Sequence, residues 1–197
     1  MSGKREYSVS GGFGVLLAIL LFMDEQNIVP WALLACFIHE MGHVLAIHML
    51  GGSVQSFRLS VIGAEIVPTR NRLFSYQEEL VIAASGPLIS CIAAIMGAYF
   101  AGGYHYEKTF LFCGLNLVAG LFNLIPEGPL DGGRMLKILL FKRYSLQKGE
   151  QIYQCITALF SISLLSLGIF HVFKLGGNLT LILTALWLLA GVRRNHA

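Results

Sequence analysis

Residues 28–50 read IVPWALLACFIHEMGHVLAIHML, an apolar run that holds two histidines and one glutamate within five consecutive positions. A run of this length is typical of a helix that crosses a lipid bilayer, which needs about 20 mostly apolar residues. Titratable groups inside such a helix are costly and usually functional. The stretch therefore predicts a membrane protein with a functional site at His39, Glu40 and His43.

The rest of the chain repeats this apolar character. Of its 197 residues, 55% are hydrophobic and 13% are charged, which is more apolar than a water-soluble domain requires. We predict six spans at roughly residues 10–23, 28–50, 77–101, 109–126, 153–173 and 177–192. Residues 53–68 alternate apolar and polar side chains and predict a short β-hairpin, with an irregular loop as the alternative. The expected fold is an all-α polytopic membrane protein with about six transmembrane helices and one membrane-associated hairpin.

The basic residues indicate how this chain is oriented. With six spans, Lys108 and Lys174 fall on one side and the other twelve of the 14 Lys and Arg residues fall on the opposite side. Because cytoplasmic loops accumulate Lys and Arg, we expect both termini in the cytoplasm. This distribution also explains the net charge of +3, so nucleic-acid binding is not expected. The four cysteines show no C-x-x-C spacing and are interpreted as packing residues.

The His-Glu-x-x-His motif has the spacing of a zinc site. His39 and His43 are four residues apart, so on a helix their side chains point the same way from consecutive turns. Two imidazoles at this spacing can chelate one zinc ion, while Glu40 flanks them and can reach a water molecule without becoming a ligand. Glu40 is therefore the candidate general base. The alternative is a polar cluster that only joins helices by hydrogen bonds.

A third protein ligand must come from elsewhere in the chain. His48 is the nearest candidate, but it lies about 140° around the helix from His43 and is better interpreted as an interfacial residue. Four glutamates could also provide a ligand oxygen: Glu65, Glu78, Glu79 and Glu127. Glu65, Glu78 and Glu79 lie in or beside the basic loop, where ordinary solvation explains them.

Asp131 is the preferred third ligand. It occurs in NLIPEGPLDGG at residues 123–133, where Pro126 should end the preceding helix and the two glycines allow the backbone to turn the carboxylate back. The alternative is that Asp131 caps a short helix over residues 134–141.

Three motifs together resemble the site-2 protease family of intramembrane zinc metalloproteases. They are H-E-x-x-H at 39–43, Ser85-Gly86-Pro87, and N-x-x-P-x-x-x-L-D-G-G at 123–133, within a match over roughly residues 28–141. The six-span layout is most similar to the sporulation-protease branch, typified by the stage IV sporulation protein FB. The resemblance implies one Zn²⁺ held by His39, His43 and Asp131, with Glu40 as the catalytic base.

The same resemblance implies that Asn123 and Asn116 help to hold the substrate or the tetrahedral intermediate, with helix-to-helix hydrogen bonding as the alternative for Asn116. Glu127 differs from the pattern of this family, because relatives often carry an apolar residue at that position. Whether Glu127 meets substrate, a cation or water is left open.

The expected function is a zinc metalloendopeptidase that cuts transmembrane or membrane-associated proteins in a bacterial cytoplasmic membrane. We expect a single membrane-embedded peptidase domain over residues 1–197 with no appended soluble domain, and a regulatory membrane protein is left open as a partner. One alternative is a zinc or other cation transporter, which would need polar residues through the depth of the membrane. The other is an inactive membrane adaptor, although every expected catalytic position is filled.

Overall fold

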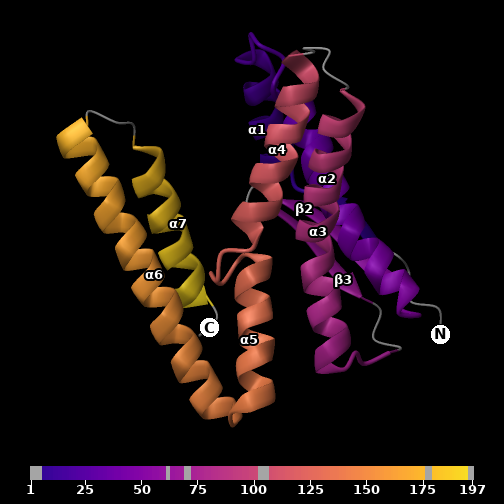
Figure 1. Cartoon of the computed structure of the whole chain (residues 1–197), viewed down its shortest axis with the longest axis vertical. Coiled ribbons are helices and arrows are strands. Elements are labelled where there is room, and N and C mark those ends of the chain that lie inside the picture. Colours follow the sequence, from indigo (N-terminus) through magenta and orange to yellow (C-terminus); the bar gives the residue numbers. More distant parts are fainter. Residues whose placement is uncertain (1–5, 61–62, 69–71, 102–106, 176–178, 195–197) are drawn as a thin grey trace. The chain divides into compact units, whose positions relative to one another are not determined.

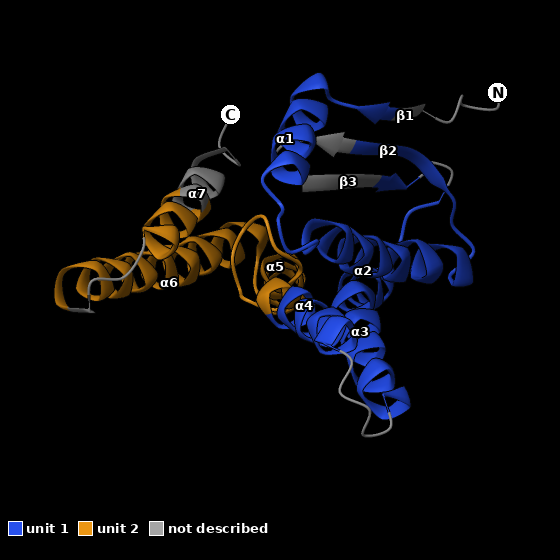
Figure 2. Ribbon diagram, turned by 90° about the horizontal axis from the view of Figure 1, so that it is seen from above, with its two compact units in different colours: residues 1–121 blue, residues 122–197 orange. Residues whose placement is uncertain are grey.

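The computed structural model describes residues 6–60, 63–68, 72–101, 107–175 and 179–194. It divides into two compact units, Met1–Leu121 and Phe122–Ala197 (Figure 2). The helices and strands of the described residues are drawn in Figure 1 and run in this order: β1 Glu6–Val9, α1 Gly11–Phe22, α2 Val29–Met49, β2 Val54–Ser60, β3 Gly63–Pro68, α3 Tyr76–Phe100, α4 Glu107–Asn123, α5 Asp131–Arg143, α6 Leu146–Leu175 and α7 Thr180–Arg194.

Each of the six expected spans coincides with one helix: α1, α2, α3, α4, α6 and α7. Among the described residues, three of these helices are long and apolar enough to cross a membrane, namely α2, α3 and the part of α6 from Leu146 to Lys174. α1 is a shorter apolar helix. The structure is thus a mostly helical membrane protein with three candidate spans and a small sheet.

The spanning helices carry large apolar side chains on their outer faces. Ile95 on α3 is 67% exposed and Leu159 on α6 is 72% exposed in the isolated chain. Broad apolar surfaces of this kind are rare on water-soluble monomers, whereas lipid chains cover them without cost. These faces are therefore the parts of the helices that meet the bilayer.

The predicted hairpin is confirmed, and it belongs to a larger sheet. β2 and β3 pair antiparallel, with Phe57 opposite Ile66. β1 pairs parallel with the other edge of β2, with Tyr7 opposite Phe57, so the strand order is β1-β2-β3. Figure 2 shows the three strands side by side next to α2. The addition of β1 makes β2 a central strand, which the prediction of a hairpin did not include.

α2 and α3 approach each other closely because glycines lie at their contact. A Cβ atom added to Gly42 would stand 2.6 Å from the backbone oxygen of Ser85 and 3.0 Å from the Cα atom of Gly86. Small residues at a helix contact allow this kind of backbone approach in membranes. The histidine-bearing turn of α2 is thereby held directly against the Ser85-Gly86-Pro87 turn of α3.

The second unit presents Asp131 at the start of α5. α5 and α6 are joined by an ion pair between Lys137 Nζ and Glu150 Oε2 at 3.0 Å. The turn before α5 is compact, because the Leu130 amide donates to the Glu127 carbonyl at 2.9 Å. α5 begins three residues earlier than the helix expected over residues 134–141, so that the glycines following Asp131 are already helical.

Candidate active site

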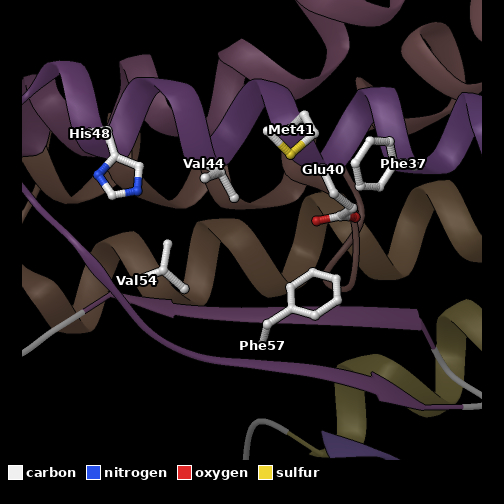
Figure 3. Close-up of a pocket in the computed structure, with 7 residues that line it drawn as sticks. All are labelled: Phe37, Glu40, Met41, Val44, His48, Val54 and Phe57. Atoms are coloured by element: carbon white, nitrogen blue, oxygen red, sulfur yellow. The ribbon is translucent and has the colours of Figure 1, made fainter. Parts of the chain in front are cut away.

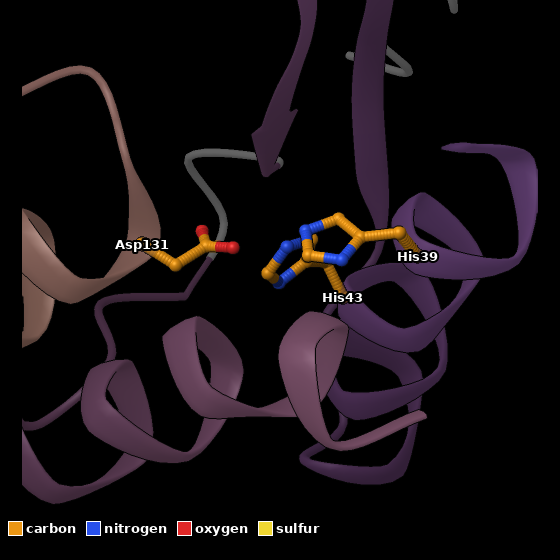
Figure 4. Close-up of side chains that lie close together, drawn as sticks. All are labelled: His39, His43 and Asp131. Atoms are coloured by element: carbon orange, nitrogen blue, oxygen red, sulfur yellow. The ribbon is translucent and has the colours of Figure 1, made fainter. Parts of the chain in front are cut away.

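His39 and His43 lie together on α2 as their spacing predicts. Both side chains are buried, with 5% and 8% of their surfaces exposed. Their ring centroids are 5.1 Å apart and the ring planes are inclined by 78°. Figure 4 shows the two imidazoles next to each other, one turn apart on the helix. Two ring nitrogens at this spacing can approach one ion.

The Nδ1 atom of each ring is held by α3. His43 Nδ1 lies 2.8 Å from the Ile82 carbonyl oxygen. Since a carbonyl oxygen only accepts hydrogen bonds, Nδ1 carries the hydrogen in this contact and the lone pair of the neutral ring is on Nε2. His39 Nδ1 lies 3.1 Å from Ser90 Oγ, which can accept the same kind of bond. Metal-binding histidines usually have one nitrogen oriented in this way while the other binds the metal.

Gly86 provides the space in front of the two Nε2 atoms. An added Cβ atom would stand 2.9 Å from His39 Nε2 and 2.5 Å from His43 Cε1, and it would overlap His43 Nε2. Both Nε2 atoms therefore face the same glycine. The interior Pro87 follows directly and interrupts the regular bonding of this turn, because proline has no amide hydrogen.

Asp131 is the first residue of α5, and Leu130 is the N-cap. Asp131 therefore lies in the first turn of α5 and not at the N-cap position. The two following glycines are required by close backbone contacts, since a Cβ atom on Gly132 would stand 2.5 Å from the Ile125 oxygen and one on Gly133 would overlap the Glu127 oxygen. Among the described residues, His39, His43 and Asp131 are the group of side chains that could hold a metal ion, and Figure 4 draws these three.

Glu40 lines a pocket between α2 and the sheet. The pocket has a volume of about 240 Å³, and seven residues line it (Figure 3): Phe37, Glu40, Met41, Val44, His48, Val54 and Phe57. His48 is exposed and belongs to this pocket rather than to the candidate metal group, in agreement with its interpretation as a residue other than a ligand. The pocket itself was not predicted from the sequence, because it depends on which face of α2 the sheet covers.

Two of the other glutamates can be placed. Glu78 forms a capping box with Ser75 at the start of α3 and an ion pair with Arg72, so its carboxylate has a structural role. Glu79 lies beside it in the same first turn of α3. The side chain of Glu65 lies outside the described residues.

The two asparagines of α4 have different surroundings. Asn116 is fully buried, and its Nδ2 atom donates to the Phe112 carbonyl of the same helix at 2.9 Å. Its Oδ1 atom is buried without a hydrogen-bond partner among the described residues. Asn123 is the last residue of α4, in the second unit. Their roles in substrate binding stay predictions.

Glu127 is fully buried within the second unit. Ser161 Oγ on α6 donates to Glu127 Oε1 at 2.6 Å, while Oε2 has no partner in the described part of the chain. Burial raises the pKa of the Glu127 carboxyl, and the bonds from Ser161 and the Gly128 amide oppose the rise. Contact with α6 was not foreseen. Thr157 and Ser161, two buried hydroxyls four residues apart in an apolar helix, were the available signal.

The mostly helical fold with apolar candidate spans defines an integral membrane protein, and the buried His39 and His43 belong to a group of side chains that could hold a metal ion. The chain belongs to the Peptidase M50B-like family, whose model matches residues 13–184.

Named relatives and a solved structure agree with this membership. A zinc metalloprotease of Methanocaldococcus jannaschii is 29% identical over 190 residues, which cover 91% of this chain and 54% of that protein. The stage IV sporulation protein FB of Bacillus subtilis is 24% identical over 142 residues, which cover 70% of this chain and 49% of that protein. This chain thus spans about half the length of these two relatives.

The structure of a site-2 protease from Methanocaldococcus jannaschii matches with a TM-score of 0.69 and 25% identity, over 98% of this chain and 91% of that one.

Proposed function

We propose that this protein is an intramembrane zinc metalloprotease that hydrolyses peptide bonds of membrane-embedded or membrane-associated proteins. The observation that carries the proposal is the shared direction of the two Nε2 atoms, which face Gly86 while α3 holds both Nδ1 atoms. Together with the Asp131 carboxylate, this arrangement suits a divalent ion. Membership of the family supports it.

In this proposal one Zn²⁺ is held by His39 Nε2, His43 Nε2 and the Asp131 carboxylate. Two imidazoles and one carboxylate are a ligand set of catalytic zinc sites, which keep a further position open. A bound zinc ion supplies Lewis acidity, which lets water be deprotonated near neutral pH and polarises the scissile carbonyl.

Glu40 is the proposed general base. It follows His39 directly, so its carboxylate flanks the histidine face of α2 rather than pointing along it. Glu40 takes a proton from the attacking water and later passes it to the leaving amine. Asn123 and Asn116 are proposed to hold the substrate, and Asn123 or backbone donors are proposed to stabilise the negative charge on the carbonyl oxygen.

The substrate must present an extended segment, because the peptide bonds of an intact helix are hidden. The outer edges of β1 and β3, which no described strand covers, offer backbone groups for pairing with such a segment. We propose that the chain crosses the membrane six times as a single peptidase domain, with both termini in the cytoplasm of a bacterial cell. The active site is proposed to lie nearer the cytoplasmic face, and water would enter from that side. A regulatory membrane protein as a second partner is left open.

Replacement of Glu40 by glutamine tests the function. Glu40→Gln keeps the size of the side chain but removes its basicity, so the purified variant should retain zinc and fail to cut. Proteins crosslinked to Glu40→Gln in native membranes, identified by mass spectrometry, should then be cleaved by the parent protein. Glu107→Gln, at an exposed position in the first turn of α4, is the matched control and should cut like the parent. Undiminished cleavage by Glu40→Gln would exclude the proposed base.

A further inference from the structure

We propose that the pocket beside Glu40 receives one large apolar side chain of the substrate next to the scissile bond. It is called the α2–β2 pocket below and is defined by the seven residues of Figure 3. The enzyme would then prefer to cut beside leucine, methionine or phenylalanine. This inference rests on the proposed function and adds the chemistry of the residue at the cut.

The position of Glu40 connects the pocket to the histidines. On a helix with about 100° per residue, Glu40 lies about 100° from His39 and about 60° from His43 around the axis. Val44 and His48 follow Glu40 at four-residue intervals and continue its stripe away from the histidine face. Figure 3 shows Glu40, Val44 and His48 in this order along α2, on the side that faces β2. A carbonyl placed near Glu40 therefore has the pocket directly beside it.

The lining decides which side chain fits. Five of the seven lining residues are apolar: Phe37, Met41, Val44, Val54 and Phe57. Apolar cavities of about 150 Å³ bind benzene, so a volume of about 240 Å³ has room for an aromatic ring or a branched aliphatic side chain. Burial of a large apolar side chain in such a pocket is energetically favourable. A charged side chain would find a polar partner in the lining only at the Glu40 and His48 ends.

The sheet makes one wall of the pocket firm. Phe57 lies on β2, whose backbone is paired with β1 on one edge and with β3 on the other. Because both edges of β2 are paired from Ser56 to Leu59, this part of the strand cannot add an extended peptide by backbone pairing. It can offer side chains, and Val54 and Phe57 do so toward α2. Recognition in this pocket is therefore by the shape of a side chain.

Val44 is the position at which the pocket can be changed most directly. It is half-buried, lies between the Glu40 and His48 ends, and is not part of the proposed metal site or its proton transfer. Val44→Trp fills the pocket and Val44→Ala enlarges it. Leu45→Trp is the matched control, since Leu45 is the next residue of α2, is 51% exposed and does not line the pocket.

The experiment uses purified zinc-loaded protein in detergent and a mixed peptide library, with the cut sites read by mass spectrometry. The parent and Leu45→Trp should cut beside leucine, methionine or phenylalanine at least about tenfold more often than beside alanine at one flanking position. Val44→Trp should lose this preference in favour of small residues, and Val44→Ala should extend it to tryptophan.

An unchanged profile in both Val44 variants would overturn the pocket assignment while leaving the proposed function standing. An equal change in Leu45→Trp would also overturn it, because the effect would then not come from the pocket. If the parent protein with bound zinc cuts no peptide and no trapped membrane protein, the proposed function itself fails.

Discussion

Replacing Gly86 by alanine adds one methyl group where both histidine rings face α3. The new Cβ atom would stand 2.5 Å from His43 Cε1, which is about 1 Å short of a favourable carbon–carbon separation of 3.5–4.0 Å. It would also stand 2.9 Å from His39 Nε2. At least one ring must therefore move by about 1 Å, whereas metal–ligand distances tolerate only about 0.2 Å.

We expect Gly86→Ala to weaken zinc binding by about 100-fold or more, equivalent to about 2.7 kcal/mol. The measurement is the zinc dissociation constant of the purified protein, by competition with a chelator, together with the melting temperature of the metal-free form. Gly114→Ala is the control, because an alanine Cβ atom there meets nothing within 4 Å. If Gly86→Ala folds and binds zinc as tightly as Gly114→Ala, the two Nε2 atoms do not form the metal site described above.

Three further predictions concern Asp131, Ser90 and Glu127. Loss of a residue that only orients a metal ligand typically weakens metal binding roughly 10–100-fold, and Asp131→Ala should weaken zinc binding by more than this because it removes a proposed ligand. A zinc content equal to that of the parent would mean that another residue completes the site. Ser90→Ala should weaken zinc binding within that range, because it releases the His39 ring. Ser163→Ala, at an exposed hydroxyl that donates to its own helix, should not, and equal affinities of the two variants would argue against the role of Ser90. Because burial raises the pKa of Glu127, the native state holds this proton more tightly, and stability should fall as the pH rises above about 4.3 toward the raised pKa. Glu127→Gln should flatten that fall in melting temperature, and parallel pH profiles for parent and variant would refute it.

The helices could be read from the sequence because each apolar block is long and continuous. The positions of α1, α2, α3, α4, α6 and α7 match the six expected spans, and the alternation after Ser53 gave the antiparallel pair β2 and β3. β1 was missed because it has four residues, Glu6–Val9, and its partner strand begins almost 50 residues later. Pairing over that distance leaves no periodic signal in so short a segment.

Part of the candidate site could likewise be predicted from the sequence, and part could not. The spacing of His39 and His43 determines that their rings share one face of a helix, so this part could be predicted. Which nitrogen of each ring would face a metal could not, because it depends on Ser90 and on the Ile82 carbonyl of another helix. Nor could the pocket beside Glu40 be foreseen, since its far wall comes from β2.

The site depends on residues of both α2 and α3, and this has a consequence for how the protein is assembled in the membrane. α2 carries the imidazoles, but α3 supplies the two atoms that orient them and the glycine that makes room before them. During synthesis α2 is made before α3, so at that stage the contacts from Ile82 and Ser90 to its rings are absent. Helices associate in lipid through close packing rather than through the hydrophobic effect. In the proposed zinc site, tight binding of the ion therefore requires that α3 has been inserted and that Gly42 contacts the Ser85-Gly86 turn of α3. A chain inserted only as far as α2 would lack a complete centre and could not cleave neighbouring proteins.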